Sequence, residues 1–166
     1  MNYVIPEIAS ATRDDIAGIL DLQECNLLDQ GGLLTVRLPR AFIEAALDDL
    51  PVIVARRNGQ VVGYLLSSSR AAQAHVPIVQ AMFRAYAGSP DAYIYGPICV
   101  AESERGQGLT ARLFQEMRAR LPGRECVTFI RRDNIPSLRA HLKIGMKDVA
   151  SFTHEGVPHA VVVHPG

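Results

Sequence analysis

The sequence predicts an α/β fold, and three observations support this prediction. Apolar runs of strand character alternate along the chain with segments whose apolar residues recur at helical spacing. Asn58-Gly59 stands between two β-rich runs, which is a strong signal for a tight hairpin. A strand-like run ending at Val100 leads into the glycine-rich stretch ESERGQGLT and then into a helical pattern. We expect the whole chain, 1–166, to form a single domain.

The N-terminal part of the chain predicts two helices followed by the hairpin. Thr12 and Asp15 are similar to a capping box, which marks the start of a helix. Pro39 and Pro51 stand where a second helix begins and ends. The expected elements are helices over residues 13–25 and 39–50 and strands over residues 52–57 and 60–68.

The rest of the chain predicts further alternating helices and strands. Gly96-Pro97 interrupts a strand-like run and predicts a bulge or an unpaired edge inside this strand, because proline cannot donate to a ladder and glycine tolerates unusual dihedrals. Gly145 is placed to cap a helix, and Glu155-Gly156 to join two strands. The expected elements are a partly irregular helix within residues 69–90, a strand over 92–101, a helix ending near 121, a strand over 126–132, a helix over 136–144 and two strands within 147–164.

The glycines of ESERGQGLT indicate a phosphate-binding turn. A strand that runs through glycines into a helix points backbone N–H groups and the positive end of the helix dipole at one spot. Gly106 and Gly108 would let a ligand approach the backbone, and Arg105 can add a charge-assisted bond. The lysine of a nucleoside triphosphate loop is missing. The dinucleotide fingerprint matches weakly, so binding of NAD stays an alternative.

Two segments carry a resemblance to a known family. ICVAESERGQGLTARLF resembles the acetyl-CoA-binding motif of the GNAT superfamily of N-acetyltransferases, and NIPSLRAHLKIGM is similar to the second motif of that superfamily. The order of the expected elements also agrees with this family. The resemblance implies a GNAT-like mixed, mostly antiparallel central sheet that is flanked by helices on both faces.

The resemblance also implies which residues bind acetyl-CoA. The backbone of the bulged strand would hold the pantetheine arm, and the N–H of Val100 would meet the developing oxyanion. The glycine turn would wrap the pyrophosphate, and Asn134 would contact the pantetheine amide. The implied cofactor-binding residues are Ile98, Cys99, Val100, Arg105, Gly106, Gln107, Gly108, Leu109, Thr110, Asn134, Ser137 and His141.

Three of these residues also allow a second interpretation. Arg105 can be a solvated surface side chain. Thr110 stands where glycine or alanine is usual, so it either replaces a small residue passively or adds a hydroxyl ligand. His141 stands where the family commonly has the tyrosine that protonates the departing thiolate. Histidine can act as an acid near neutral pH, or it can border the cofactor while water supplies the proton.

A general base for the acceptor amine is less visible. Tyr95, Glu24 and Asp29 lie near the expected acceptor side, and each is also explained as a surface or packing residue. We expect no metal, because the cysteines and the other histidines show no ligand spacing. With 17 basic and 17 acidic residues, the chain offers no net charge for binding nucleic acid or membrane. No signal peptide or membrane span is visible, which favours the cytoplasm.

The sequence therefore predicts an N-acetyltransferase that moves an acetyl group from acetyl-CoA to a primary amine by direct attack. The expected acceptor is a small molecule or a peptide. A homodimer is possible. The alternative is a non-catalytic acyl-CoA-binding or regulatory module on the same fold, which the missing tyrosine and the unclear base favour.

Overall fold

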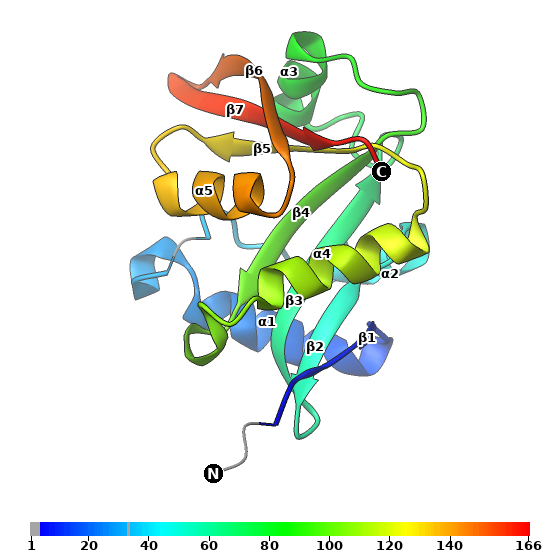
Figure 1. Ribbon diagram of the computed structural model, residues 1–166, viewed down its shortest axis with the longest axis vertical. Helices are drawn as coiled ribbons and strands as arrows, with labels where there is room; N and C mark the ends of the chain where they lie inside the picture. Colours follow the sequence, from blue (N-terminus) through cyan, green and yellow to red (C-terminus); the bar gives the residue numbers. More distant parts are fainter. Residues whose placement is uncertain (1–3, 33) are drawn as a thin grey trace. The chain divides into compact units, whose positions relative to one another are not determined.

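The computed structural model describes residues 4–32 and 34–166. Within them, the chain forms seven strands and five α-helices (Figure 1). The strands are β1 (Glu7–Ser10), β2 (Ile53–Arg57), β3 (Gln60–Ser69), β4 (Tyr93–Val100), β5 (Cys126–Arg131), β6 (Lys147–His154) and β7 (Val157–His164). The helices are α1 (Ile16–Cys25), α2 (Arg40–Asp49), α3 (Pro77–Ala85), α4 (Leu109–Arg120) and α5 (Ile135–Lys143), with 3-10 turns η1 (Arg13–Asp15), η2 (Leu28–Gln30) and η3 (Glu102–Glu104).

The strands form one mixed sheet in the order β1-β2-β3-β4-β5-β7-β6. The pairs β1–β2, β2–β3, β5–β7 and β6–β7 are antiparallel, whereas β4 and β5 run parallel. The parallel pair needs a long crossover, and α4 lies in the chain between its two strands. The expected mixed, mostly antiparallel sheet is confirmed.

Residue contacts divide the chain into two compact units, which we describe separately. The first unit comprises Met1–Ser67 and Pro97–Arg120, and the second comprises Ser68–Gly96 and Leu121–Gly166. The chain passes from the second unit into the first at Gly96-Pro97, inside β4. The expectation of a single domain over residues 1–166 stays a prediction. No helix in the described part of the chain is long and apolar enough to cross a membrane.

In the first unit, helices cover both faces of the β2–β3 hairpin (Figure 1). Val54, Tyr64 and Leu66 pack into one core with α1 and α2. On the other face, Gly63 lies against Leu109 of α4, where an added Cβ would come within 3.2 Å of Cδ2. Side chains along a strand alternate between faces, so the same hairpin packs against α1 and α2 on one face and against α4 on the other.

In the second unit, α3 and α5 lie on opposite faces of the strands (Figure 1). Ile94 of β4 packs with Val79 and Met82 of α3 in an apolar core. The next residue, Tyr95, points to the other face and meets His141 of α5. This alternation along β4 determines which side chain reaches α5.

The local signals read from the sequence are largely confirmed. Asn58 and Gly59 both have positive φ, 50° and 79°, as a two-residue hairpin turn requires. Gly145 has φ 97° and closes α5, since its N–H donates to the carbonyl of Leu142. The capping box is present, with the Thr12 N–H donating to Asp15 at 2.8 Å.

One strand was missed. β1 spans only Glu7–Ser10, pairs with β2 at the edge of the sheet, and keeps its side chains partly exposed. A strand this short, with neither face fully buried, has no clear alternation of apolar and polar residues. The elements expected from the sequence therefore begin only with the helix over residues 13–25.

Candidate functional site

The glycine turn between η3 and α4 has the backbone conformation that the sequence indicated. Gly106 and Gly108 have φ of 73° and 76°, a region that side chains with a Cβ rarely adopt. A Cβ added at either position would meet no atom of the described residues within 4 Å. The glycines are therefore needed for the path of the chain, and the space beside them is open to a ligand.

The same turn presents backbone donors. The first α-helical bond of α4 runs from the Arg112 N–H to the Gly108 carbonyl at 3.2 Å. Within residues 4–32 and 34–166, no acceptor meets the N–H groups from Gly106 to Ala111. Such donors, at the positive end of a helix dipole, suit the oxygens of a phosphate. The residues present therefore fit the pyrophosphate of acetyl-CoA.

Arg105 adds a positive charge to the turn, and part of its bonding capacity is used by the protein. Its Nη2 donates to Oδ1 of Asn26, which follows α1, and its Nε lies 3.4 Å from the Val100 carbonyl. The side chain remains exposed. Arg105 is thus not a freely solvated surface residue, because its guanidinium donates to Asn26 and lies beside the Val100 carbonyl.

The turn is anchored by a buried ion pair that the sequence did not suggest. Glu104 is only 4% exposed and accepts two bonds from Arg57 of β2, at 2.7 and 2.8 Å. Two parallel bonds between a guanidinium and a carboxylate restrict the orientation of both groups. The residue immediately before Arg105 is therefore held to the hairpin.

The end of β4 carries the backbone that the resemblance assigns to the pantetheine arm. Gly96 has φ 102°, which departs from regular strand geometry, while the bulge itself stays a prediction. Cys99 is buried in the core of the first unit, whereas Ile98 and Val100 are half-buried. Burial raises the pKa of the Cys99 thiol to about 12, so this side chain contributes packing and stays protonated.

The second motif begins at the N-terminus of α5. Asn134 is the cap of this helix, with Oδ1 accepting from the Ser137 N–H at 3.3 Å. A ligand amide would therefore have to use the remaining bonding capacity of Asn134. Ser137 and His141 share one face of α5, as predicted, and Ser137 Oγ lies 3.3 Å from His141 Nδ1.

His141 is held by bonds at both ring nitrogens. Nδ1 lies 2.7 Å from the Ser137 carbonyl oxygen, and Nε2 lies 3.1 Å from the Tyr95 hydroxyl. A carbonyl can only accept, so Nδ1 carries the hydrogen, and in the neutral ring Nε2 accepts from Tyr95. The two rings meet edge to face, with centroids 5.4 Å apart.

The surroundings of this pair favour its neutral form. His141 is 4% exposed and Tyr95 3% exposed. Burial lowers the pKa of His141, and the bond to the Ser137 carbonyl opposes this only in part. Burial also raises the pKa of Tyr95 well above its usual value. At neutral pH the pair is therefore an uncharged O–H···N bond.

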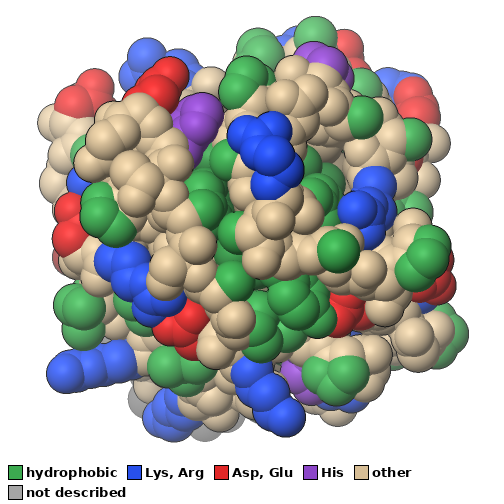
Figure 2. All heavy atoms as spheres, turned by 90° about the horizontal axis from the view of Figure 1, so that it is seen from above, with side chains coloured by type: hydrophobic (Ala, Val, Ile, Leu, Met, Phe, Trp, Pro, Cys, Tyr) green, Lys and Arg blue, Asp and Glu red, His purple; other side chains and the backbone are tan. Residues whose placement is uncertain are grey.

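The other residues considered from the sequence are placed less specifically. Glu24 forms an exposed ion pair with Arg37, and Asp29 is exposed in η2. His159 is buried, and its Nδ1 bonds the Val157 carbonyl at 2.8 Å. Among the described residues, no group of three or more His, Cys, Asp or Glu side chains could hold a metal ion. Positive and negative side chains are interspersed on the face shown in Figure 2.

Sequence comparison identifies the family. Residues 19–146 match the model of the acetyltransferase (GNAT) family, which is more than half of the chain. A comparison with curated protein sequences gave no significant match.

Solved structures show the same fold over nearly the whole chain. The protein yncA from Salmonella typhimurium, solved with its cofactor acetyl-CoA, has a TM-score of 0.71 at 17% identity, covering 98% of this chain and 94% of that one. The ribosomal-protein-S18-alanine N-acetyltransferase of Escherichia coli has a TM-score of 0.70 at 12% identity, covering 97% and 94%. A phosphinothricin acetyltransferase from Sinorhizobium meliloti, in complex with acetyl-CoA, has a TM-score of 0.69 at 20% identity, covering 98% and 89%.

Proposed function

Because the chain belongs to the acetyltransferase (GNAT) family, we propose that it moves the acetyl group of acetyl-CoA to a primary amine. The neutral amine attacks the thioester carbon directly, the carbon–sulfur bond breaks, and the products are the amide and free CoA. Acetyl-CoA is the cosubstrate, as in the neighbours from Salmonella typhimurium and Sinorhizobium meliloti that were solved with it.

The glycine turn supplies the pyrophosphate site in this proposal. Its backbone donors from Gly106 to Ala111 and the guanidinium of Arg105 match the charge and geometry of phosphate oxygens. The half-buried end of β4 supplies the backbone for the thioester. There the N–H of Val100 would stabilise the oxyanion. The observation that carries the proposal is the set of backbone N–H groups beside Gly106 and Gly108, which meet no acceptor among the residues that the structure describes.

His141 is the candidate acid for the thiolate. It starts neutral, so it must first take a proton at Nε2 as the attacking amine, once bonded to the thioester carbon, loses one through water. It then gives that proton to the sulfur as the carbon–sulfur bond breaks, and the neutral ring is restored. The number of protons balances, and His141 returns to its starting state.

The acceptor amine can belong to a small molecule or to a peptide terminus. Neighbours of equally similar fold are named for a ribosomal-protein alanine and for phosphinothricin, so likeness of fold does not select between these classes. The two segments in which we expect acceptor specificity, 22–38 and 69–90, contain η2 and α3.

The cofactor assignment can be tested by titrating CoA into the protein in a calorimeter. We expect Gly108→Val to weaken CoA binding at least about tenfold, because the new side chain fills the space beside the donors and strains φ. Gly59→Val is the matched control, since Gly59 has φ 79° with equally open surroundings in the hairpin turn. Equal affinity in both variants, or no binding by the unmodified chain, would contradict the assignment.

A non-catalytic CoA-binding module remains the second candidate, because both nitrogens of His141 are engaged by protein groups. Release of CoA in the presence of a panel of amines, corrected for hydrolysis, separates the two. An enzyme releases CoA in proportion to the acetylated amine, whereas a binding module retains CoA affinity without release.

A further inference from the structure

Tyr95 contacts the imidazole that the proposed reaction needs to be protonated. Its hydroxyl comes from β4 and lies 3.1 Å from Nε2 of His141, on the side of the ring opposite to the Ser137 bond. Nδ1 is already committed to a carbonyl, so Nε2 is the only nitrogen that can take up a proton. The hydrogen-bond partner of Nε2 therefore influences the pKa of this buried imidazole.

A hydroxyl is suited to both states of the ring. It donates to Nε2 when the imidazole is neutral, and after rotation about its C–O bond it accepts from Nε2–H when the imidazole is charged. The charge-assisted bond is the stronger of the two. A phenylalanine ring at the same place would leave the buried Nε2–H of the cation without a partner.

We propose that Tyr95 is a positioning residue that allows the buried His141 to take and return a proton at Nε2, by changing from hydrogen-bond donor to acceptor. This inference rests on the proposed function, because it concerns the acid of that reaction. Tyr95 itself neither gains nor loses a proton overall, so no further reactant is needed.

Other groups also contact the Tyr95–His141 pair. On α5, Ser137 presents its carbonyl and hydroxyl to Nδ1. The ionisable groups that act on Tyr95 include Tyr93 of β4 and Cys126 of β5, and both of these side chains are buried. Their effect is to oppose ionisation of the Tyr95 phenol, which keeps its proton on oxygen.

The first test measures the pKa of His141 by NMR of ¹⁵N-labelled imidazole. In the unmodified chain we expect a hydrogen on Nδ1 and a pKa below the usual value for histidine. Tyr95→Phe should lower the pKa further, by about one pH unit, because the cation loses its acceptor. The control is Tyr86→Phe, which removes a hydroxyl bonded to Glu125 in the same unit and should leave His141 unchanged. An unchanged or higher pKa in Tyr95→Phe would overturn the inference.

The second test is a double-mutant cycle on the rate of acetyl transfer. Tyr95→Phe should lower kcat about tenfold with the KM for acetyl-CoA unchanged, and should move the acid limb of the pH profile to lower pH. In a His141→Gln background the same substitution should have no further effect, because Tyr95 acts through His141. Independent, multiplying effects would overturn the inference. If the unmodified chain transfers no acetyl group, the proposed function fails while the NMR result still tests the Tyr95–His141 bond.

Discussion

Asp15 is a carboxylate that the fold removes from water and surrounds with donors. Arg56 donates to both of its oxygens, at 2.8 and 2.6 Å, and the Thr12 N–H donates at 2.8 Å. Burial alone would raise the pKa of Asp15, but the bonds from Arg56 and Thr12 outweigh it, and the pKa is lowered. The ionised carboxylate therefore contributes to stability.

Replacing Asp15 by asparagine should lower the free energy of unfolding by about 3 kcal/mol at pH 7, because Arg56 loses its partner. A lowered native pKa means that this contribution is complete above the unfolded-state pKa and is lost as pH falls through the native pKa. The difference between the two proteins should therefore shrink below about pH 5. Urea unfolding at several pH values measures this difference in the free energy of unfolding. A difference that is independent of pH would contradict the stabilising role of the ionised Asp15 carboxylate.

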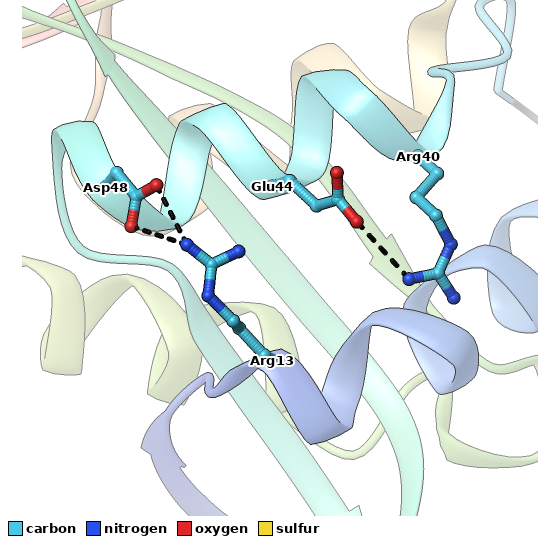
Figure 3. A network of polar contacts seen from close by, with 4 residues as sticks. All are labelled: Arg13, Arg40, Glu44 and Asp48. Carbon is cyan, nitrogen blue, oxygen red and sulfur yellow. Dashed lines mark hydrogen bonds and ion pairs between the residues drawn. The ribbon is translucent and has the colours of Figure 1, made fainter.

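The exposed pair between Arg13 and Asp48 provides the control (Figure 3). Both side chains are more than half exposed, so Asp48→Asn should cost less than about 1 kcal/mol. Figure 3 also shows Arg40 and Glu44, a pair one helical turn apart on α2 at 3.4 Å. An effect of Asp48→Asn as large as that of Asp15→Asn would show that burial is not the cause.

At the scale of elements, the packing of α1 on β3 depends on a glycine in the first turn of the helix. A Cβ at Gly18 would lie 2.8 Å from Cγ2 of Val61, closer than real side chains approach. Glycine within a helix costs about 1 kcal/mol relative to alanine, so close packing opposes helix propensity at this position. The presence of glycine at position 18 indicates that close packing against Val61 outweighs helix propensity there.

Because close packing and helix propensity oppose each other at Gly18, the effect of Gly18→Ala on stability should change sign when the close contact with Val61 is removed. Gly18→Ala alone should destabilise the protein by about 1–2 kcal/mol, because overpacking exceeds the gain in helix propensity. In a Val61→Ala background the clash is removed, and the same substitution should stabilise by about 0.5–1 kcal/mol. Chemical denaturation of the four proteins in this cycle measures both values, and the same sign in both backgrounds would refute the packing argument.

Elements were predictable where a local signal determines them. The Asn58-Gly59 turn, the cap of α5 at Gly145 and the glycines before α4 each need a backbone conformation that few residues adopt. The Tyr95–His141 bond and the burial of Glu104 depend instead on residues 46 and 47 positions apart in the chain. Side chains that far apart meet only through tertiary packing, and nothing in either local sequence indicates the partner.

At the scale of the whole molecule, the fold and the family were predictable because two motifs stand in the right order along a chain of the right length. The acceptor was not, since its contacts come from segments without a recognisable pattern. The numbers of basic and acidic residues are equal, so overall charge does not indicate a class of acceptor either.

Ligand binding should stabilise the whole molecule against heat. At a CoA concentration about 100 times the dissociation constant, mass action adds about 2.7 kcal/mol to the free energy of unfolding. For a chain of this length we expect Tm to rise by about 5–10 °C. NAD at the same concentration should leave Tm unchanged. A larger rise with NAD than with CoA would instead favour the dinucleotide-binding alternative.

The burial of the cysteines has a practical consequence for such measurements. Cys25 is exposed at the end of α1, whereas Cys99 and Cys126 are buried. A thiol-reactive fluorophore should therefore attach at Cys25 alone under native conditions. The next residue, Asn26, is the one that bonds Arg105 of the glycine turn. The natural sequence thus offers an attachment point for an optical reporter beside the proposed pyrophosphate site, without an engineered cysteine.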